Sequence, residues 1–167
     1  MEFVEDVSAP SIRQSIGSFL SDQNVSKLMD AGQVVRYQIG EYLFREGQPH
    51  GDLYVLLDGI VTLVMTIPGR GPQRILTVGS GELLAWSAMV GSSNHPCNLY
   101  RSTPISATTS TTTAPTMTCD AVSATTTTLL RINGQALKDI FNTEPQFGFE
   151  FMQWLASRSE ERRVGKE

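Results

Sequence analysis

The feature that most constrains this chain is a run of short strand-like segments between residues 34 and 81, punctuated by glycine. Apolar and polar residues alternate through much of the run, which reads VVRYQIG, EYLFREG, DLYVLLDG, IVTLVMTI and QRILTVGSG. A period of two places successive side chains on opposite faces of a sheet, and glycine permits the positive φ of a tight turn. We expect turns of this kind at Gly40, Gly47, Gly59 and Gly79, and a hairpin loop at 68–72, PGRGP. This half of the chain therefore predicts short antiparallel strands.

Segments with a helical period flank this run on both sides. The spacing predicts a first helix from Ser11 to about residue 20, a second after Ser21 and Asp22, and a third over 135–141. The last helix is the clearest, because large apolar side chains repeat at helical spacing and form one wide stripe: Phe147, Phe151, Trp154 and Leu155. A stripe of this kind packs on the rest of the fold or on a second chain.

The pattern breaks after residue 81. Residues 83–89 are apolar and are expected to form a short helical turn. The segment from residue 91 to about 128 is rich in Ser, Thr and Pro, so we expect an exposed insertion without regular pairing at about 91–115. Two further strands are expected at 120–124 and 128–132, where apolar residues return.

Composition excludes several classes of protein. The 167 residues fit one domain, and a formal net charge of -4 excludes a nucleic-acid surface as the dominant feature. The chain has no apolar run long enough to cross a bilayer and its first residues are acidic, so we expect a cytoplasmic protein. Cys97 and Cys119 lack metal-ligand spacing and are expected to be free thiols.

Three short motifs carry a resemblance to a known family. GEYLFREG at 40–47, LYVLLDG at 53–59 and VTLV at 61–64 resemble the signature of the cyclic-nucleotide-binding domain family, G-x-x-L-F-x-E-G, L-Y-x-V-x-x-G and V-x-L. The resemblance extends from about Val25 to Trp154. It implies a mainly β fold with flanking helices, an antiparallel double-stranded β-helix, that is, a jelly-roll-like β-roll, as in catabolite-activator-like regulators.

The same resemblance implies a domain organisation. We expect an N-terminal helical lead at 1–24, the β-roll at 25–145 with its insertion, and a C-terminal helix and tail at 146–167. Transcription factors of the family carry a helix-turn-helix domain after the last helix, and we expect none in this chain.

In the family, a Gly-Glu pair opens the phosphate-binding cassette, and an Arg about ten positions later neutralises the cyclic phosphate. Helix N-termini and guanidinium groups both favour bound anions. Here the opening corresponds to Gly81, Glu82, Leu83 and Leu84. The expected ligand-binding residues also include Arg101 and Thr116, according to how the Arg is aligned.

Two alignments compete for the Arg. In the first, Arg101 is the cassette Arg, displaced by about ten extra residues. In the second, the strand beginning at Thr118 follows the cassette, which places the Arg position near Thr116 and leaves it without a cation. We favour the second, because the run to Ile132 then needs no gap.

Several of these residues have structural alternatives. Glu82 would be favoured at the start of a helical turn by the helix dipole even without a ligand. Trp86 is more typical of a core position than of a base-stacking platform. The terminal aromatic stripe is more typical of packing on the roll, or of a dimer interface, than of a lid over a purine.

The sequence does not predict an enzyme. A metal-dependent cupin needs several His and carboxylate ligands that converge from the strands, and this chain has only His50 and His95. We expect no metal and no cofactor.

The expected function is a regulatory small-molecule sensor that binds cAMP, cGMP or a similar anion and relays binding through its C-terminal helix to a protein partner or to a second copy. The alternative is a degenerate domain that binds no nucleotide and acts as an interaction scaffold through the 147–155 face.

Overall fold

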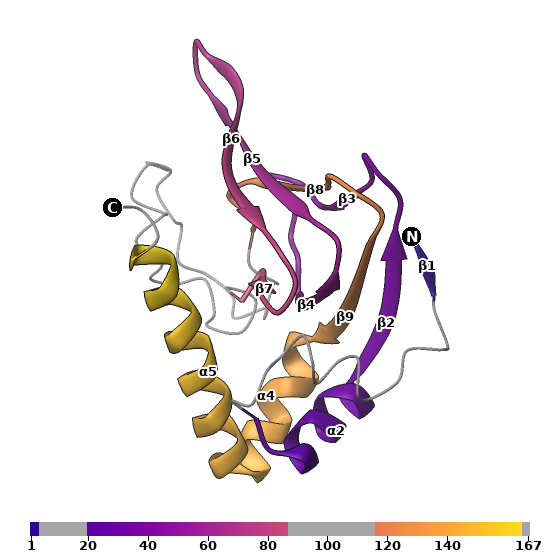
Figure 1. Cartoon of the computed structure of the whole chain (residues 1–167), viewed down its shortest axis with the longest axis vertical. Helices are drawn as coiled ribbons and strands as arrows, with labels where there is room; N and C mark the ends of the chain where they lie inside the picture. Colours follow the sequence, from indigo (N-terminus) through magenta and orange to yellow (C-terminus); the bar gives the residue numbers. More distant parts are fainter. Residues whose placement is uncertain (4–19, 87–115, 165–167) are drawn as a thin grey trace, which may run out of the picture.

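A computed structural model of the chain describes residues 1–3, 20–86 and 116–164, with side chains up to residue 157 (Figure 1). The expected helix from Ser11, the insertion at about 91–115, Arg101 and His95 lie outside the described residues. Within the described part the elements are β1 (Glu2–Phe3), α2 (Asp22–Ala31), β2 (Gly32–Tyr37), β3 (Tyr42–Phe44), β4 (Asp52–Asp58), β5 (Val61–Ile67), β6 (Gly71–Val78), β7 (Leu83–Leu84), β8 (Asp120–Ser123), β9 (Thr127–Asn133), α4 (Gly134–Thr143) and α5 (Pro145–Val164).

The strands form two antiparallel sheets. One has the order β1-β2-β9-β4-β7 and the other the order β3-β8-β5-β6. We call them the five-stranded and the four-stranded sheet. Figure 1 shows the β5–β6 hairpin projecting from the roll and the three helices gathered at the other end. The predicted mainly β roll with flanking helices is confirmed.

Two apolar cores share the five-stranded sheet as a common wall. Strand β4 alternates between them: Leu53 and Val55 face the helices, whereas Tyr54 and Leu56 face the four-stranded sheet. Six of its seven residues are buried, because both faces are covered. This explains why the segment reads as a nearly continuous apolar run.

Caps and polar contacts set the ends of the helices. The Ser21 hydroxyl accepts from the Asn24 N–H and caps α2, as expected from the sequence. The Asn24 amide donates to the Glu150 carboxylate of α5 at 2.5 Å, and Lys27 pairs with Glu144 at the end of α4. Helix α2 is therefore tied to the start of α5. Among the described residues, no helix is long and apolar enough to cross a membrane.

The glycine turns are mostly where the sequence places them. Gly40, Gly47 and Gly59 have positive φ, but Gly79 does not, and Gly81 has a φ of 81° in its place. Gly59 is needed for a second reason, since a Cβ there would lie 2.6 Å from the carbonyl oxygen of Thr126. The expectation for Gly79 was wrong because the turn begins at Gly79, and the residue in it that adopts a positive φ is Gly81.

The helical turn expected at 83–89 is not found where the structure describes it. Leu83 and Leu84 form β7, paired with Val55 and Tyr54 of β4. An apolar pair next to a buried strand gains more from the ladder than from a single helical turn, because an isolated turn is costly to nucleate. Residues 87–89 lie outside the described part.

The aromatic stripe of α5 belongs to the core of its own chain. Phe147, Phe151 and Trp154 are buried against the five-stranded sheet together with residues of α2 and α4, and Leu155 packs beside them. The stripe is therefore not available as a dimer or scaffold surface, which corrects that expectation. The outer face of α5 exposes other residues, Phe149 and Met152.

This assignment predicts opposite results for two substitutions on one helix. Phe151→Ala removes a fully buried ring and is expected to lower the free energy of unfolding by about 3–5 kcal/mol. Phe149→Ala, a matched control whose ring is 58% exposed, is expected to change it by about 0.5 kcal/mol or less. Urea denaturation followed by circular dichroism measures both, and equal effects would show that α5 does not pack through this stripe.

Candidate functional site

The residues expected to open the cassette lie on a turn fastened to β4. The Gly81 N–H donates to the Leu56 carbonyl at 2.7 Å, and the Leu56 N–H donates to the Glu82 carbonyl at 2.9 Å. The Glu82 N–H donates to the Gly79 carbonyl at 3.2 Å and closes the turn. We call residues 81–84 the Gly81–Leu84 turn. Its backbone is fixed by a strand that is itself buried on both faces.

The Glu82 side chain has a local structural role. Its carboxylate accepts from the Gly79 N–H at 2.6 Å. The described residues show no helix beginning at Glu82, so a helix dipole does not explain this residue. A carboxylate has two oxygens with several lone pairs, so this bond does not exhaust its capacity to accept hydrogen bonds.

Leu83 and Leu84 point into different cores. Leu83 packs with the helices in the cluster that contains Phe151 and Trp154, whereas Leu84 packs inside the roll with Tyr54 and Leu56. Both are almost fully buried. Their side chains therefore hold the turn between the two cores, and their contact with a ligand stays a prediction.

The backbone is unusual directly after the turn. Ala85 has a φ of 58° and is the one non-glycine residue with positive φ among those described. Such conformations cost of order 1–3 kcal/mol and cluster at functional sites. Trp86 follows and is 38% exposed, so the preferred core position for this residue was wrong.

The structure does not place Thr116 on the turn. Thr116 is exposed and forms an isolated β-bridge with Pro49, whereas the turn pairs with residues further along β4. Its neighbour Met117 is buried in the same core as Leu84. Arg101 lies outside the described residues, so both alignments of the cassette Arg stay predictions.

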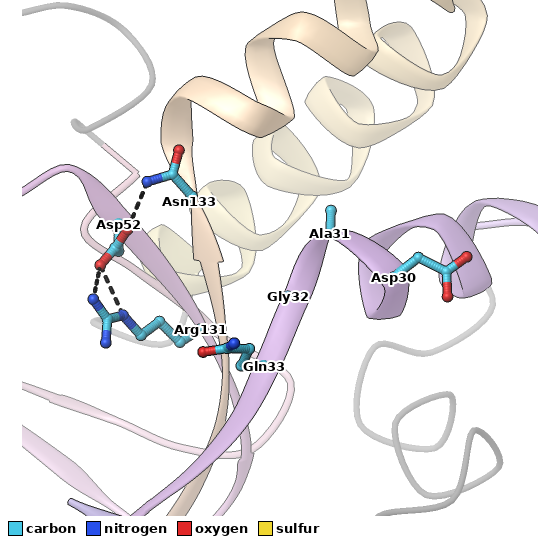
Figure 2. A pocket seen from close by; sticks show the side chains of 7 residues that line it. All are labelled: Asp30, Ala31, Gly32, Gln33, Asp52, Arg131 and Asn133. Atoms are coloured by element: carbon cyan, nitrogen blue, oxygen red, sulfur yellow. Dashed lines mark hydrogen bonds and ion pairs between the residues drawn. The ribbon is translucent and has the colours of Figure 1, made fainter. Parts of the chain in front are cut away.

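A polar cluster that sequence reasoning missed lies at one end of the five-stranded sheet (Figure 2). The Asp52 carboxylate accepts from Arg131 Nε at 2.7 Å and Nη2 at 2.5 Å through one oxygen, and from Asn133 Nδ2 at 3.2 Å through the other. Asn133 Oδ1 in turn caps α4 by accepting from the N–H groups of Gln135 and Ala136. The cluster joins β4, β9 and the start of α4.

A cleft of about 350 Å³ opens beside this cluster. It is lined by the end of α2, the start of β2 and the polar cluster: Asp30, Ala31, Gly32, Gln33, Asp52, Arg131 and Asn133. Figure 2 shows Asp30 on α2, away from the dashed contacts of Asp52. Arg131 is neutralised by Asp52, so the cleft has no net positive charge with which to hold a phosphate.

His50 lies next to the polar cluster, in the loop before β4. Its ring stacks on Tyr54 with centroids 5.5 Å apart, and it also contacts Phe44 at 5.2 Å. Burial lowers the pKa of His50, and Arg131 acts in the same direction, against the attraction of Asp52. Burial also raises the pKa of the Tyr54 hydroxyl, and the neighbouring Tyr37 adds to this effect.

Two signals in the sequence could have revealed this cluster. Asp52 begins an otherwise apolar strand, and Arg131 interrupts the apolar run LLRI. A charged side chain within a buried strand is usually paired. Which residue pairs with which depends on the register of β4 and β9, which the sequence does not supply.

Comparison with known proteins agrees with this fold. The family model of the cyclic nucleotide-binding domain matches residues 34–111. A cyclic nucleotide-binding domain from Methylobacillus flagellatus superposes with a TM-score of 0.66 at 21% identity, over 95% of this chain and 82% of the other. The sensor domain of the transcriptional regulator DNR from Pseudomonas aeruginosa gives a TM-score of 0.61 at 16% identity, over 95% and 91%. The resemblance drawn from the sequence motifs is confirmed.

A curated relative matches a shorter segment. Human cGMP-dependent protein kinase 2 is 27% identical over 81 residues, which is 48% of this chain and 11% of the kinase. The chain therefore corresponds to a small part of that protein.

The Asp52–Arg131 pair makes a testable contribution to stability. Asp52→Asn leaves the guanidinium without its countercharge and is expected to lower the free energy of unfolding by about 1–3 kcal/mol, less than for a fully buried pair because Arg131 is partly exposed. Asp58→Asn, at the exposed end of the same strand, is the matched control and is expected to change it by about 0.5 kcal/mol or less. Chemical denaturation at pH 7 compares the two variants. An unchanged free energy of unfolding in Asp52→Asn would contradict a stabilising role for the Asp52–Arg131 pair.

Proposed function

Because the chain has the β-roll fold of cyclic nucleotide-binding domains, we propose that it is a regulatory small-molecule sensor that binds a cyclic nucleotide or a similar small anion at the Gly81–Leu84 turn. The observation that carries the proposal is the placement of the Gly81-Glu82 pair. It lies inside the segment that the family model matches, on a turn fixed by hydrogen bonds to β4. The name of the kinase relative favours cGMP as the first probe, and cAMP is tested beside it as a second cyclic nucleotide.

The chemistry of the turn supports a ligand of this class. A carboxylate such as that of Glu82 can accept a hydrogen bond from a sugar hydroxyl while it accepts from Gly79. A cyclic phosphate carries one negative charge, and a guanidinium would offset the cost of removing that charge from water. Arg101 supplies this group in the first alignment, whereas the second alignment leaves the phosphate with backbone N–H groups alone.

The packing also supports a relay to the C-terminal helix. Leu83 directly follows Glu82 and belongs to the same apolar cluster as Phe151 and Trp154 of α5. Because a close-packed core does not absorb a shift of one side chain, a ligand that moves the turn also changes the preferred position of α5. The relay requires that the ligand bind one arrangement of α5 more tightly than the other.

A second function is favoured by a different surface. Phe149 and Met152 lie three residues apart on the outer face of α5, where their side chains are 58% and 48% exposed. Residues at this spacing are neighbours on a helix. In this reading the chain binds no nucleotide and α5 contacts a protein partner through this outer face.

A calorimetric titration with cAMP and cGMP distinguishes these functions. We expect the wild type to bind at least one of them. Arg101→Ala is expected to weaken binding by roughly tenfold to a few hundredfold if Arg101 pairs with the phosphate, since a hydrogen bond to a charged group contributes about 1.5–3 kcal/mol.

Two controls complete this titration. Arg70→Ala, in the exposed turn of the β5–β6 hairpin that projects from the roll, removes the same charge and is expected to leave affinity unchanged. Tight binding that survives Arg101→Ala would contradict both alignments. Absence of heat with both nucleotides in the wild type would overturn the sensor function and favour the scaffold.

A further inference from the structure

A proton on Nε2 of His50 would have no partner, although the ring's hydrogen bond to the backbone of Asp52 favours the protonated form. The Nε2 atom is buried and has no hydrogen-bond acceptor, and the ring lies against Phe44 and Tyr54. Buried polar atoms are nearly always paired in native structures, and an unpaired charged group is the most costly exception. The neutral ring tolerates this position because an unprotonated imidazole nitrogen needs no acceptor.

The charged groups around His50 act in opposite directions, since Asp52 favours the protonated ring and Arg131 disfavours it. Asp52 already accepts from Arg131 through one carboxylate oxygen and from Asn133 through the other. Arg131, on β9, repels a second positive charge. Tyr54, on β4, faces the ring through its stacking contact, and burial raises the pKa of its hydroxyl.

The ring is connected to the Gly81–Leu84 turn through one strand. Tyr54, on which His50 stacks, pairs directly with Leu84 of β7. Two residues along, Leu56 makes both backbone hydrogen bonds that fasten the turn. A displacement of Tyr54 therefore acts on the strand segment that holds the turn.

We propose that His50 is a pH-sensitive latch for the Gly81–Leu84 turn: the neutral ring packs on Tyr54 and keeps β4 and β7 paired, and protonation releases the ring and loosens that pairing. The regulatory meaning of the latch rests on the proposed function of the turn, whereas the latch itself does not need a ligand.

The direction of the pH dependence follows from the burial of the ring. Burial lowers the pKa of His50 in the closed state below its value in an open or unfolded chain. Above about pH 6.5 the ring is neutral in both states and the latch is fully closed. As the pH falls through that value, the open state binds the proton first, so closure is lost progressively until the pKa of the closed state is reached.

Amide hydrogen exchange at Gly81 and Leu56 tests the latch, because these N–H groups make the bonds that fasten the turn. Between pH 7.0 and 5.5, and after correction for intrinsic exchange, we expect wild-type protection to fall by at most about tenfold for each pH unit, the limit for one proton. His50→Phe keeps an aromatic ring without the titrating group and is expected to show constant protection. His95→Gln removes the only other histidine and is expected to behave as the wild type.

Other results would overturn the latch. Constant protection in the wild type would do so, as would an equal fall in His50→Phe. Should His50→Phe not fold, an NMR titration of the two imidazoles in the wild type tests the latch instead. The latch requires that the pKa of His50 lie below that of an ordinary histidine, and an unshifted pKa would overturn it. A cAMP titration at both pH values separates the two proposals. Absence of binding at pH 7.0 overturns the sensor function alone, whereas binding with equal affinity at both pH values overturns the regulatory meaning of the latch.

Discussion

The structure depends on a single buried strand. Strand β4 is covered by helices on one face and by the four-stranded sheet on the other, and it pairs with β9 and β7 at its edges. Removing its backbone groups from water requires that they be paired, so the two neighbouring strands are held in fixed register. That register sets the position of everything the proposed function uses.

Two polar features lie at opposite ends of this strand. At its start, Asp52 joins Arg131 and Asn133, and His50 packs beside them. Towards its end, Leu56 holds the backbone of the Gly81–Leu84 turn. The residues between them are close-packed on both faces. The fold therefore places a titratable ring and the candidate ligand site on one strand, and Leu83 packs in the same core as α5.

The periodic parts of this fold could be predicted from the sequence, because a period of two or of 3.6 is visible in a single chain. The strands from β2 to β6, the Ser21 cap and the helices α4 and α5 follow from such patterns. Features that depend on pairing across the fold could not be predicted. Leu83 and Leu84 form a strand only because β4 offers a free edge, and the α5 stripe is core only because the sheet covers it. The Gly-Glu pair could be found from its motif. The Asp52 cluster could not, because the register of β4 against β9 determines which residues lie beside Asp52.

The most direct test of the account is a crystal structure of the chain grown with cAMP or cGMP. The account predicts density for the cyclic phosphate against the backbone of the Gly81–Leu84 turn, with the Glu82 carboxylate in contact with the sugar and Leu83 still packed against α5. Nucleotide density in the cleft beside Arg131, with the turn unoccupied, would contradict it.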